Sequence, residues 1–231
     1  MIRRSPSAVA WLKICGLRHP DDAEFCVKAG VDCLGLLIGK SRRPETELDI
    51  LSWEDARGLA TLARKKSTAT ALLCHSQELD DLRNAIEFIR PQMLQLQFHY
   101  DPKKIDFLKN SFPSMELVQT VRVAKPVGEG LVFDTVRKVA SDERVSAILL
   151  DSPRGGSGKS IDWETAKRLV ALHNDKKFIL AGGLNPENAK SAIEEVRPFG
   201  IDVMTGARFH RGKLDHDRVS QLAEATAKTN V

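Results

Sequence analysis

Short apolar runs alternate with longer amphipathic runs along the whole chain. The short runs have the length and apolar composition of buried strands, and WLKIC at 11–15 is the first of them. The other predicted strands lie at 33–38, 68–74, 93–97, 116–123, 146–151, 177–182 and 201–206. Between them, apolar residues recur at helical spacing, most weakly in 101–111. The pattern therefore predicts strand and helix in alternation from end to end.

Several of the helical runs begin with residues that favour helix starts. Serine, aspartate and asparagine cap helix N-termini, and proline is tolerated in the first turn. The predicted starts are marked by Pro20, Ser52, Ser76, Asp162 and Asn185, the last followed by Pro186. These signals support the division into separate helices.

Strand–helix alternation requires a parallel sheet with right-handed crossovers. Eight such units in about 200 residues fit a closed (β/α)8 barrel, with a doubly wound open sheet as the alternative. No proline-rich or low-complexity linker interrupts the units. We therefore expect residues 1–231 to form one domain, with a short N-terminal extension of about residues 1–10.

The composition narrows the class of partner. The net charge of +4 comes from scattered basic residues, which predicts an anionic small molecule as partner and no nucleic acid. No run approaches the roughly 18 apolar residues of a membrane span, so we expect a cytoplasmic protein that does not contact membranes. The four cysteines have no metal-site spacing, and no metal is expected. The oligomeric state stays open.

Reactive side chains end two of the predicted strands, where barrels place their chemistry. Cys15 ends the first strand and could act as a base or nucleophile if its pKa were lowered; the alternative is a small buried residue. Asp151 ends the sixth, and burial there would raise its pKa and suit it to general acid catalysis. The alternative for Asp151 is a residue that opens the following turn.

Glycine-rich turns follow the last three strands. They contain Gly156 and Gly158, then Gly182 and Gly183, then Thr205 and Gly206, and the last two loops of such barrels commonly bind phosphate. The stretch PRGGSGKS (153–160) also approaches a nucleotide-binding P-loop, but Pro153 stands where that motif needs its first glycine. A sugar phosphate is the better expectation for this loop. The basic segment 39–44 offers an arginine that could clamp a carboxylate.

Together these residues resemble the phosphoribosylanthranilate isomerase family of tryptophan biosynthesis, whose members are (β/α)8 barrels. The resemblance covers nearly the whole chain in order. It rests on LKICGL (12–17), GLLIGKSRR (35–43), LLDS with GGSG and IDW (149–163), ILAGGLNPENA (179–189) and IDVMTG (201–206).

The resemblance implies an aldose–ketose isomerase that performs an Amadori rearrangement without cofactor or metal. Cys15 would be the general base that takes the proton from C2 of the sugar, and Asp151 the general acid that protonates the ring oxygen. Arg43 would face the anthranilate carboxylate, and Asp202 matches an aspartate near the family's active site. The backbone around the glycines named above and Thr205 would hold the phosphate.

The chain departs from the family pattern at three places. The family's Q-L-H-G reads Gln95-Leu96-Gln97-Phe98 here, S-P-R reads Ser41-Arg42-Arg43, and S-G-V-E reads Thr205-Gly206-Ala207-Arg208, which reverses a charge. Four hypotheses remain, in this order: phosphoribosylanthranilate isomerase, a paralogous isomerase of another N-phosphoribosyl amine, a non-catalytic phosphate-binding barrel, and a P-loop NTPase.

Overall fold

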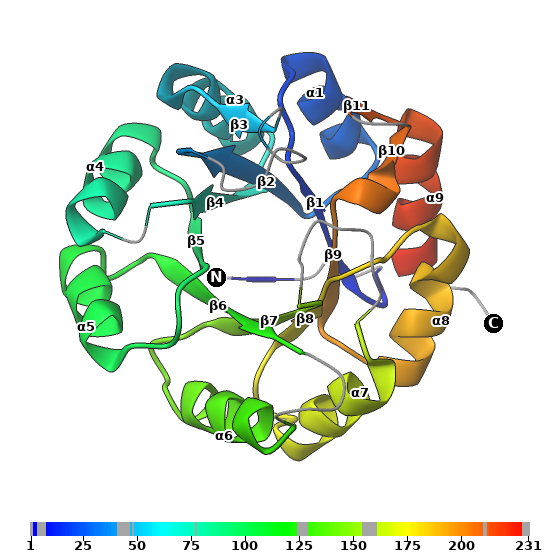
Figure 1. The fold of residues 1–231 in the computed structure, drawn as a ribbon. Helices are drawn as coiled ribbons and strands as arrows, with labels where there is room; N and C mark the ends of the chain where they lie inside the picture. Colours follow the sequence, from blue (N-terminus) through cyan, green and yellow to red (C-terminus); the bar gives the residue numbers. More distant parts are fainter. Residues whose placement is uncertain are drawn as a thin grey trace.

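A computed structural model describes residues 2–3, 8–40, 47, 49–76, 78–123, 129–153, 161–209 and 212–227. Within them, one sheet of parallel strands has the order β1-β9-β8-β7-β6-β5-β4-β2-β3, and β1 also pairs with β2. That pairing closes a ring of eight strands, with β3 added outside it on β2. The predicted (β/α)8 barrel is confirmed, and helices surround it (Figure 1).

The eight barrel strands agree closely with the apolar runs, whereas the short strands β3, β10 and β11 were not predicted. They are β1 (Trp11–Cys15), β2 (Cys33–Ile38), β3 (Ile50–Leu51), β4 (Ala69–Cys74), β5 (Met93–Leu96), β6 (Glu116–Arg122), β7 (Ala147–Asp151), β8 (Phe178–Leu180), β9 (Gly200–Val203), β10 (Arg208–Phe209) and β11 (Lys213–Leu214). The last two form a separate antiparallel hairpin.

The helices also lie where the helical spacing predicts them. They are α1 (Pro20–Lys28), α3 (Trp53–Lys65), α4 (Leu79–Ile89), α5 (Pro102–Ser111), α6 (Glu129–Ala140), α7 (Trp163–Leu172), α8 (Pro186–Val196) and α9 (His216–Thr226), with a 3-10 turn η1 (Thr205–Ala207). The weakly patterned segment 101–111 is helical, and the Asp101 side chain caps it by accepting from the Lys103 amide. None of the described helices is long and apolar enough to cross a membrane.

One predicted helix start is wrong. The N-cap of α4 is Glu78, and Ser76 lies in the turn before it, where its hydroxyl accepts from the Glu78 amide at 3.3 Å and donates to Asp81 at 2.5 Å. Ser76 therefore stabilises the turn that leads into the helix. Ser52, Asp162 and Asn185 are N-caps as expected, and Pro20 opens α1.

The last two strands are shorter than predicted because glycine turns end them. Gly182 and Gly183 have φ of +86° and +72°, a left-handed conformation that cannot continue β8. After β9 the chain turns into η1, where a Cβ on Gly206 would lie 1.9 Å from the Leu184 carbonyl oxygen. Both turns need glycine for close backbone approach.

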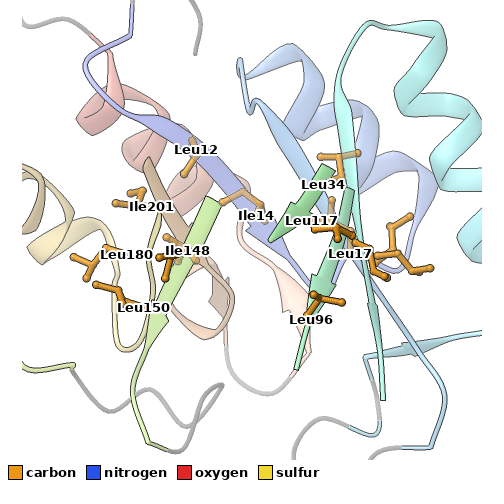
Figure 2. Close-up of a cluster of buried hydrophobic side chains, with 14 of the residues drawn as sticks. Leu12, Ile14, Leu17, Leu34, Leu96, Leu117, Ile148, Leu150, Leu180 and Ile201 are labelled. Atoms are coloured by element: carbon orange, nitrogen blue, oxygen red, sulfur yellow. The ribbon is translucent and has the colours of Figure 1, made fainter. Parts of the chain in front are cut away.

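The core has two layers, which explains why the strands are apolar throughout. Leu12 and Ile14 of β1 point outward and join the large cluster between barrel and helices, shown in Figure 2. Trp11, Lys13 and Cys15 alternate with them and point into the barrel. A parallel sheet buried on both faces loses the polar–apolar alternation of a half-exposed strand.

The amino-terminal end of the barrel is filled by an apolar cluster. Ile2, only 1% exposed, packs there with Trp11, Cys33, Met93 and Ile179, among others. The Ile2 carbonyl accepts from Lys177 Nζ at 2.7 Å. In Figure 1 the N-terminus accordingly lies at the centre of the ring.

Candidate active site

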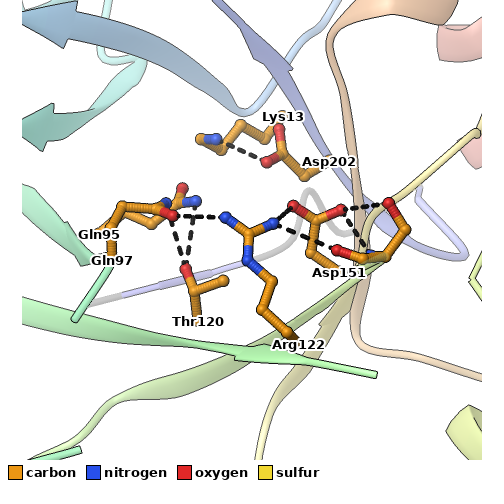
Figure 3. Close-up of polar contacts among 8 residues, drawn as sticks. Lys13, Gln95, Gln97, Thr120, Arg122, Asp151 and Asp202 are labelled. Carbon is orange, nitrogen blue, oxygen red and sulfur yellow. Dashed lines mark hydrogen bonds and ion pairs between the residues drawn. The ribbon is translucent and has the colours of Figure 1, made fainter. Parts of the chain in front are cut away.

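Polar side chains replace apolar ones as the barrel interior approaches the carboxyl ends of the strands. Lys13, Gln95, Thr120 and Asp202 are all buried there, from four different strands. Figure 3 shows them converging with the ends of β6 and β7. Buried polar groups are costly unless they are paired, so their concentration at this end marks the candidate site.

Cys15 lies at the end of β1, 3% exposed, in a small cluster with Leu37 and Leu73. It is in register with Gly35 of β2, where a Cβ would lie 2.7 Å from its Sγ, so glycine makes room for the thiol. Burial raises the pKa of Cys15 to about 11, against the lowering effect of the Lys13 ammonium and with a further rise from Asp202. The thiol is therefore protonated at neutral pH in the unliganded protein.

Lys13 and Asp202 form a buried ion pair between neighbouring strands. They are in register across β1 and β9, and Lys13 Nζ donates to Asp202 Oδ2 at 2.8 Å. Burial alone would lower the pKa of Lys13, but the charge of Asp202, which also accepts its hydrogen bond, acts against burial and the pKa is raised. Lys13 thus stays a cation beside the thiol. The other oxygen of Asp202 is buried with no partner among the described residues, which leaves an acceptor in the site.

Asp151 ends β7, as the sequence predicts. Its Oδ1 accepts from the Ser152 amide at 2.7 Å, and its Oδ2 pairs with Nη1 of Arg122, the residue in register on β6. Burial raises the pKa of Asp151 although Arg122 lowers it, and the negative charge of Asp202 adds to the rise. Because Asp202 influences both Cys15 and Asp151, it couples the two ends of the site electrostatically.

Arg122 is a site residue that the sequence reasoning missed. Its Nη2 donates to Gln97 Oε1 at 2.8 Å, and Gln97 Nε2 donates to the Thr120 hydroxyl at 3.3 Å. Arg122 lies inside the predicted strand 116–123, where no strand end drew attention to it. The available signal was the alternation Val118, Thr120, Arg122, which places all three on the inward face.

Two glycine turns and one helix start lie beside Asp151. A Cβ on Gly182 would lie 2.8 Å from the Ser152 nitrogen and 3.1 Å from Asp151 Oδ1. Gly183 follows, and α8 begins after a capping box in which the Asn185 and Asn188 side chains each accept from the other's amide. Gly206 of η1 packs against this turn, beside the Leu184 carbonyl and Asn185. The loops bring together a helix N-terminus and closely packed backbone, as a phosphate site needs.

Three of the predicted site residues, Arg43, Gly156 and Gly158, lie outside the described residues, as does most of PRGGSGKS. The described part of the chain brings no three histidine, cysteine or acidic side chains together as a metal site would.

A family model described as N-(5'phosphoribosyl)anthranilate (PRA) isomerase matches residues 12–225. The chain belongs to the N-(5'-phosphoribosyl)anthranilate isomerase family. The family's enzyme from Aquifex aeolicus is 33% identical over 227 residues, covering 93% of this chain and 97% of the relative. That of Thermotoga maritima is 31% identical over 217 residues, covering 91% and 95%.

Solved structures agree with this membership. The phosphoribosyl anthranilate isomerase from Thermotoga maritima superposes with a TM-score of 0.74 at 26% identity, covering 94% of this chain and 98% of that one. Another structure is that of the isomerase in complex with reduced 1-(o-carboxyphenylamino)-1-deoxyribulose 5-phosphate. It superposes with a TM-score of 0.72 at 25% identity, covering 94% of this chain and 97% of that one. The isomerase from Pyrococcus furiosus superposes with a TM-score of 0.76 at 22% identity, which supports the fold alone.

Two residues that differ from the isomerase family pattern form hydrogen bonds or ion pairs with other residues of the chain. Gln97, at the family's histidine, holds Arg122 as described. Arg208, at the family's glutamate, pairs with Asp49 at 2.6 Å and donates to the Gly16 carbonyl at 2.5 Å. The charge reversal at 208 is therefore compensated by a buried aspartate, and Arg208 fastens the turn after Cys15.

Proposed function

We propose that this isomerase converts N-(5'-phosphoribosyl)anthranilate to its 1-deoxyribulose 5-phosphate isomer, with Cys15 as general base and Asp151 as general acid. Asp151 gives a proton to the ring oxygen as the bond from that oxygen to C1 breaks, which opens the sugar to a Schiff base. The Cys15 thiolate then takes the proton from C2. The resulting enolamine becomes the ketose as C1 gains a proton and the C2 hydroxyl loses one. The reaction belongs to tryptophan biosynthesis and fits the expected cytoplasmic setting.

One observation carries the assignment of roles: the two reactive side chains end strands at the same barrel mouth, Cys15 buried and Asp151 with its side chain 13% exposed, and Asp202 acts on both. The reaction needs one group deprotonated and one protonated, and barrel enzymes draw catalytic residues from several strand ends. Among the described cysteines, Cys15 is the one that has Lys13, Asp202 and Arg208 as charged neighbours together.

The remaining contacts suit the two ends of such a substrate. The phosphate would lie against the backbone of Gly182, Gly183, Thr205 and Gly206 at the start of α8, with Gly156 and Gly158 from the preceding loop. Asp202 has the acceptor oxygen to bind a sugar hydroxyl. Arg43 would bind the anthranilate carboxylate through its guanidinium, and the lone pairs left on the two carboxylate oxygens can accept from a second donor.

The test is fluorescence-monitored turnover of freshly prepared N-(5'-phosphoribosyl)anthranilate. Cys15→Ala and Asp151→Asn should each lower kcat by about a hundredfold or more, the usual contribution of a general base or acid. Cys74→Ala is the matched control because Cys74 also ends a strand, β4, in a buried position, and it should retain activity. Unchanged turnover in both active-site variants would contradict the assigned roles.

The alternative of a paralogous isomerase makes a different prediction. Folded protein that ignores the anthranilate substrate, but binds the reduced deoxyribulose phosphate through the phosphate loops, would indicate the same chemistry on another amine. Absence of both binding and turnover would favour the non-catalytic barrel. The compensated charge at Arg208 removes one of the reasons to prefer these alternatives.

A further inference from the structure

The Arg122 guanidinium contacts the carboxylate that must act as the general acid. Its Nη1 pairs with Asp151 Oδ2, while the Ser152 amide donates to Asp151 Oδ1 at 2.7 Å. Both oxygens thus accept hydrogen bonds, and such bonds favour the ionised carboxylate. A general acid has to hold a proton, so this arrangement is a resting state that substrate binding must change.

We propose that Arg122 is a specificity residue: the carboxylate of the substrate's amine draws its guanidinium away from Asp151, which releases Asp151 to be protonated. The inference rests on the proposed function and deepens it. It names the preferred substrate class as N-phosphoribosyl amines that carry a carboxylate. The reaction then proceeds efficiently only with an anionic amine in place.

The position of Arg122 supports this exchange. Its side chain is 36% exposed, whereas that of Asp151 is 13% exposed, so the guanidinium is accessible from the barrel mouth. A guanidinium has five N–H donors, and the bonds to Asp151, Ser152 and Gln97 engage at most three of them. A carboxylate can therefore bind before the bond to Asp151 is lost.

Gln97 gives the guanidinium a second anchor that carries no charge. Its amide oxygen accepts from Arg122 Nη2, and Thr120 accepts from its amide nitrogen, which fixes the amide's orientation. The amide does not titrate near neutral pH, so it holds Arg122 at the mouth without competing for a proton. Arg122 can exchange one carboxylate for another while keeping this bond.

The charges around Asp151 favour its protonation once Arg122 has moved. Asp151 is faced by Arg122 from β6, its neighbour Ser152, the Gly182 turn after β8, and Asp202 from β9. Without the guanidinium, burial and the charge of Asp202 both act to raise the pKa of Asp151. The carboxyl takes its proton from solvent at the mouth and passes it to the ring oxygen. One carboxylate–guanidinium pair replaces another, so the charge of the site is kept.

The experiment compares two substrates, N-(5'-phosphoribosyl)anthranilate and N-(5'-phosphoribosyl)aniline, which lacks the carboxylate. The wild-type protein should prefer the first in kcat/KM. Arg122→Met should lower kcat/KM for the anthranilate substrate by about ten- to a hundredfold, the range expected for one charge-assisted hydrogen bond. The same variant should turn over the aniline substrate at least as well as wild type, because the guanidinium then no longer favours the ionised form of Asp151.

Two further variants separate this role from a structural one. Arg122→Lys keeps the charge without the bidentate fork and should fall between wild type and Arg122→Met in its preference. Arg137→Met, which breaks an exposed pair with Asp134 on α6, is the matched control and should leave both rates unchanged. Thermal unfolding verifies that each variant is folded.

The outcomes distinguish the inference from the proposed function. If Arg122→Met lowers both rates by the same factor, or neither, Arg122 does not sense the carboxylate and the inference is wrong while the function stands. If folded wild-type protein turns over neither substrate, the proposed function fails, and the inference fails with it. Loss of the preference for the anthranilate substrate in Arg122→Met, but not in Arg137→Met, supports both the inference and the proposed function.

Discussion

Lys13 and Asp202 place two opposite charges inside the barrel, where each depends on the other. Both side chains are almost fully buried, and removal of one partner leaves an uncompensated buried charge. Paired, they keep a cation beside Cys15 and an anion beside both Cys15 and Asp151. The pair therefore contributes to the electrostatics of the site more than to net stability, since a buried pair gains little over apolar side chains of similar size.

A double-mutant cycle tests this dependence. Lys13→Met should lower the free energy of unfolding by about 3–5 kcal/mol, because Asp202 loses its charge partner in the barrel. Lys13→Met combined with Asp202→Asn should recover most of that loss, since no buried charge remains. Urea unfolding of the two single variants and the double variant measures the coupling. A double variant as unstable as the sum of the singles would show that the two side chains act independently.

The pKa of Cys15 makes a prediction about the pH dependence of catalysis. The active form needs the thiolate of Cys15 and the protonated form of Asp151. Burial raises the pKa of Cys15 to about 11, so the thiol is protonated at neutral pH. The bonds from Arg122 and the Ser152 amide favour the carboxylate form of Asp151, against the raising effect of burial on its pKa. Where the thiol is mostly protonated and Asp151 is mostly ionised, a rise in pH increases the thiolate fraction of Cys15 by the same factor by which it lowers the protonated fraction of Asp151. The population of the active form is then constant.

We therefore expect kcat/KM to be nearly flat between about pH 7 and 9, without the falling limb that a thiol with an unperturbed pKa near 8.5 would give. Steady-state rates in overlapping buffers measure this, with thermal unfolding to verify the fold at each pH. A tenfold fall across that interval would mean that Cys15 titrates there and that its burial has less effect than the structure indicates.

At the scale of the elements, the apolar pattern predicts most of the fold. β1 and β2 match their predicted ranges residue for residue, because a strand buried on both faces is apolar along its whole length. The start of α4 was misplaced because Ser76 also stabilises the preceding turn, and a sequence does not distinguish the two uses of a serine.

The site could be predicted to the extent that strand ends mark it. Cys15 and Asp151 lie where the barrel predicts, but Arg122 enters the site through the alternation of an interior strand position. Its partner Gln97 comes from β5's end, 25 residues away. Such contacts depend on which strands become neighbours, and local patterns do not carry that information.

The glycine turn that ends β8 also packs against the general acid, Asp151. One substitution tests both roles of this turn. Gly182→Ala should cost about 1 kcal/mol or more in unfolding free energy, since its φ is +86°. It should also lower kcat, because the added Cβ would push against the Ser152 nitrogen and Asp151 Oδ1. Gly58→Ala is the matched control: the exposed helix position has space for a Cβ, and alanine should stabilise α3 by about 0.5–1 kcal/mol. Equal effects of the two substitutions would contradict this account.

In the whole molecule, the two ends of the barrel have separate tasks. The mouth holds the polar side chains, while the amino-terminal end is closed by apolar packing around Trp11 and Ile2. The segment before β1 is also hydrogen-bonded to the end of α9, because the amides of Val9 and Ala10 donate to the Thr226 carbonyl. Stability and catalysis should therefore respond to different substitutions.

Ile2→Ala tests that separation. The side chain is 1% exposed, so its truncation leaves a cavity beneath the barrel floor and should cost about 2–3 kcal/mol, the low end for a buried isoleucine because the terminal segment can move inward. The kcat for the anthranilate substrate should stay within about twofold of wild type, since Ile2 packs at the barrel end opposite Cys15 and Asp151. Leu131→Ala, at an apolar side chain 73% exposed on α6, should change neither quantity. Unfolding in urea and turnover of the same preparations give both readouts. A fall in kcat that follows the loss of stability in Ile2→Ala would mean that the floor of the barrel also positions the catalytic strand ends.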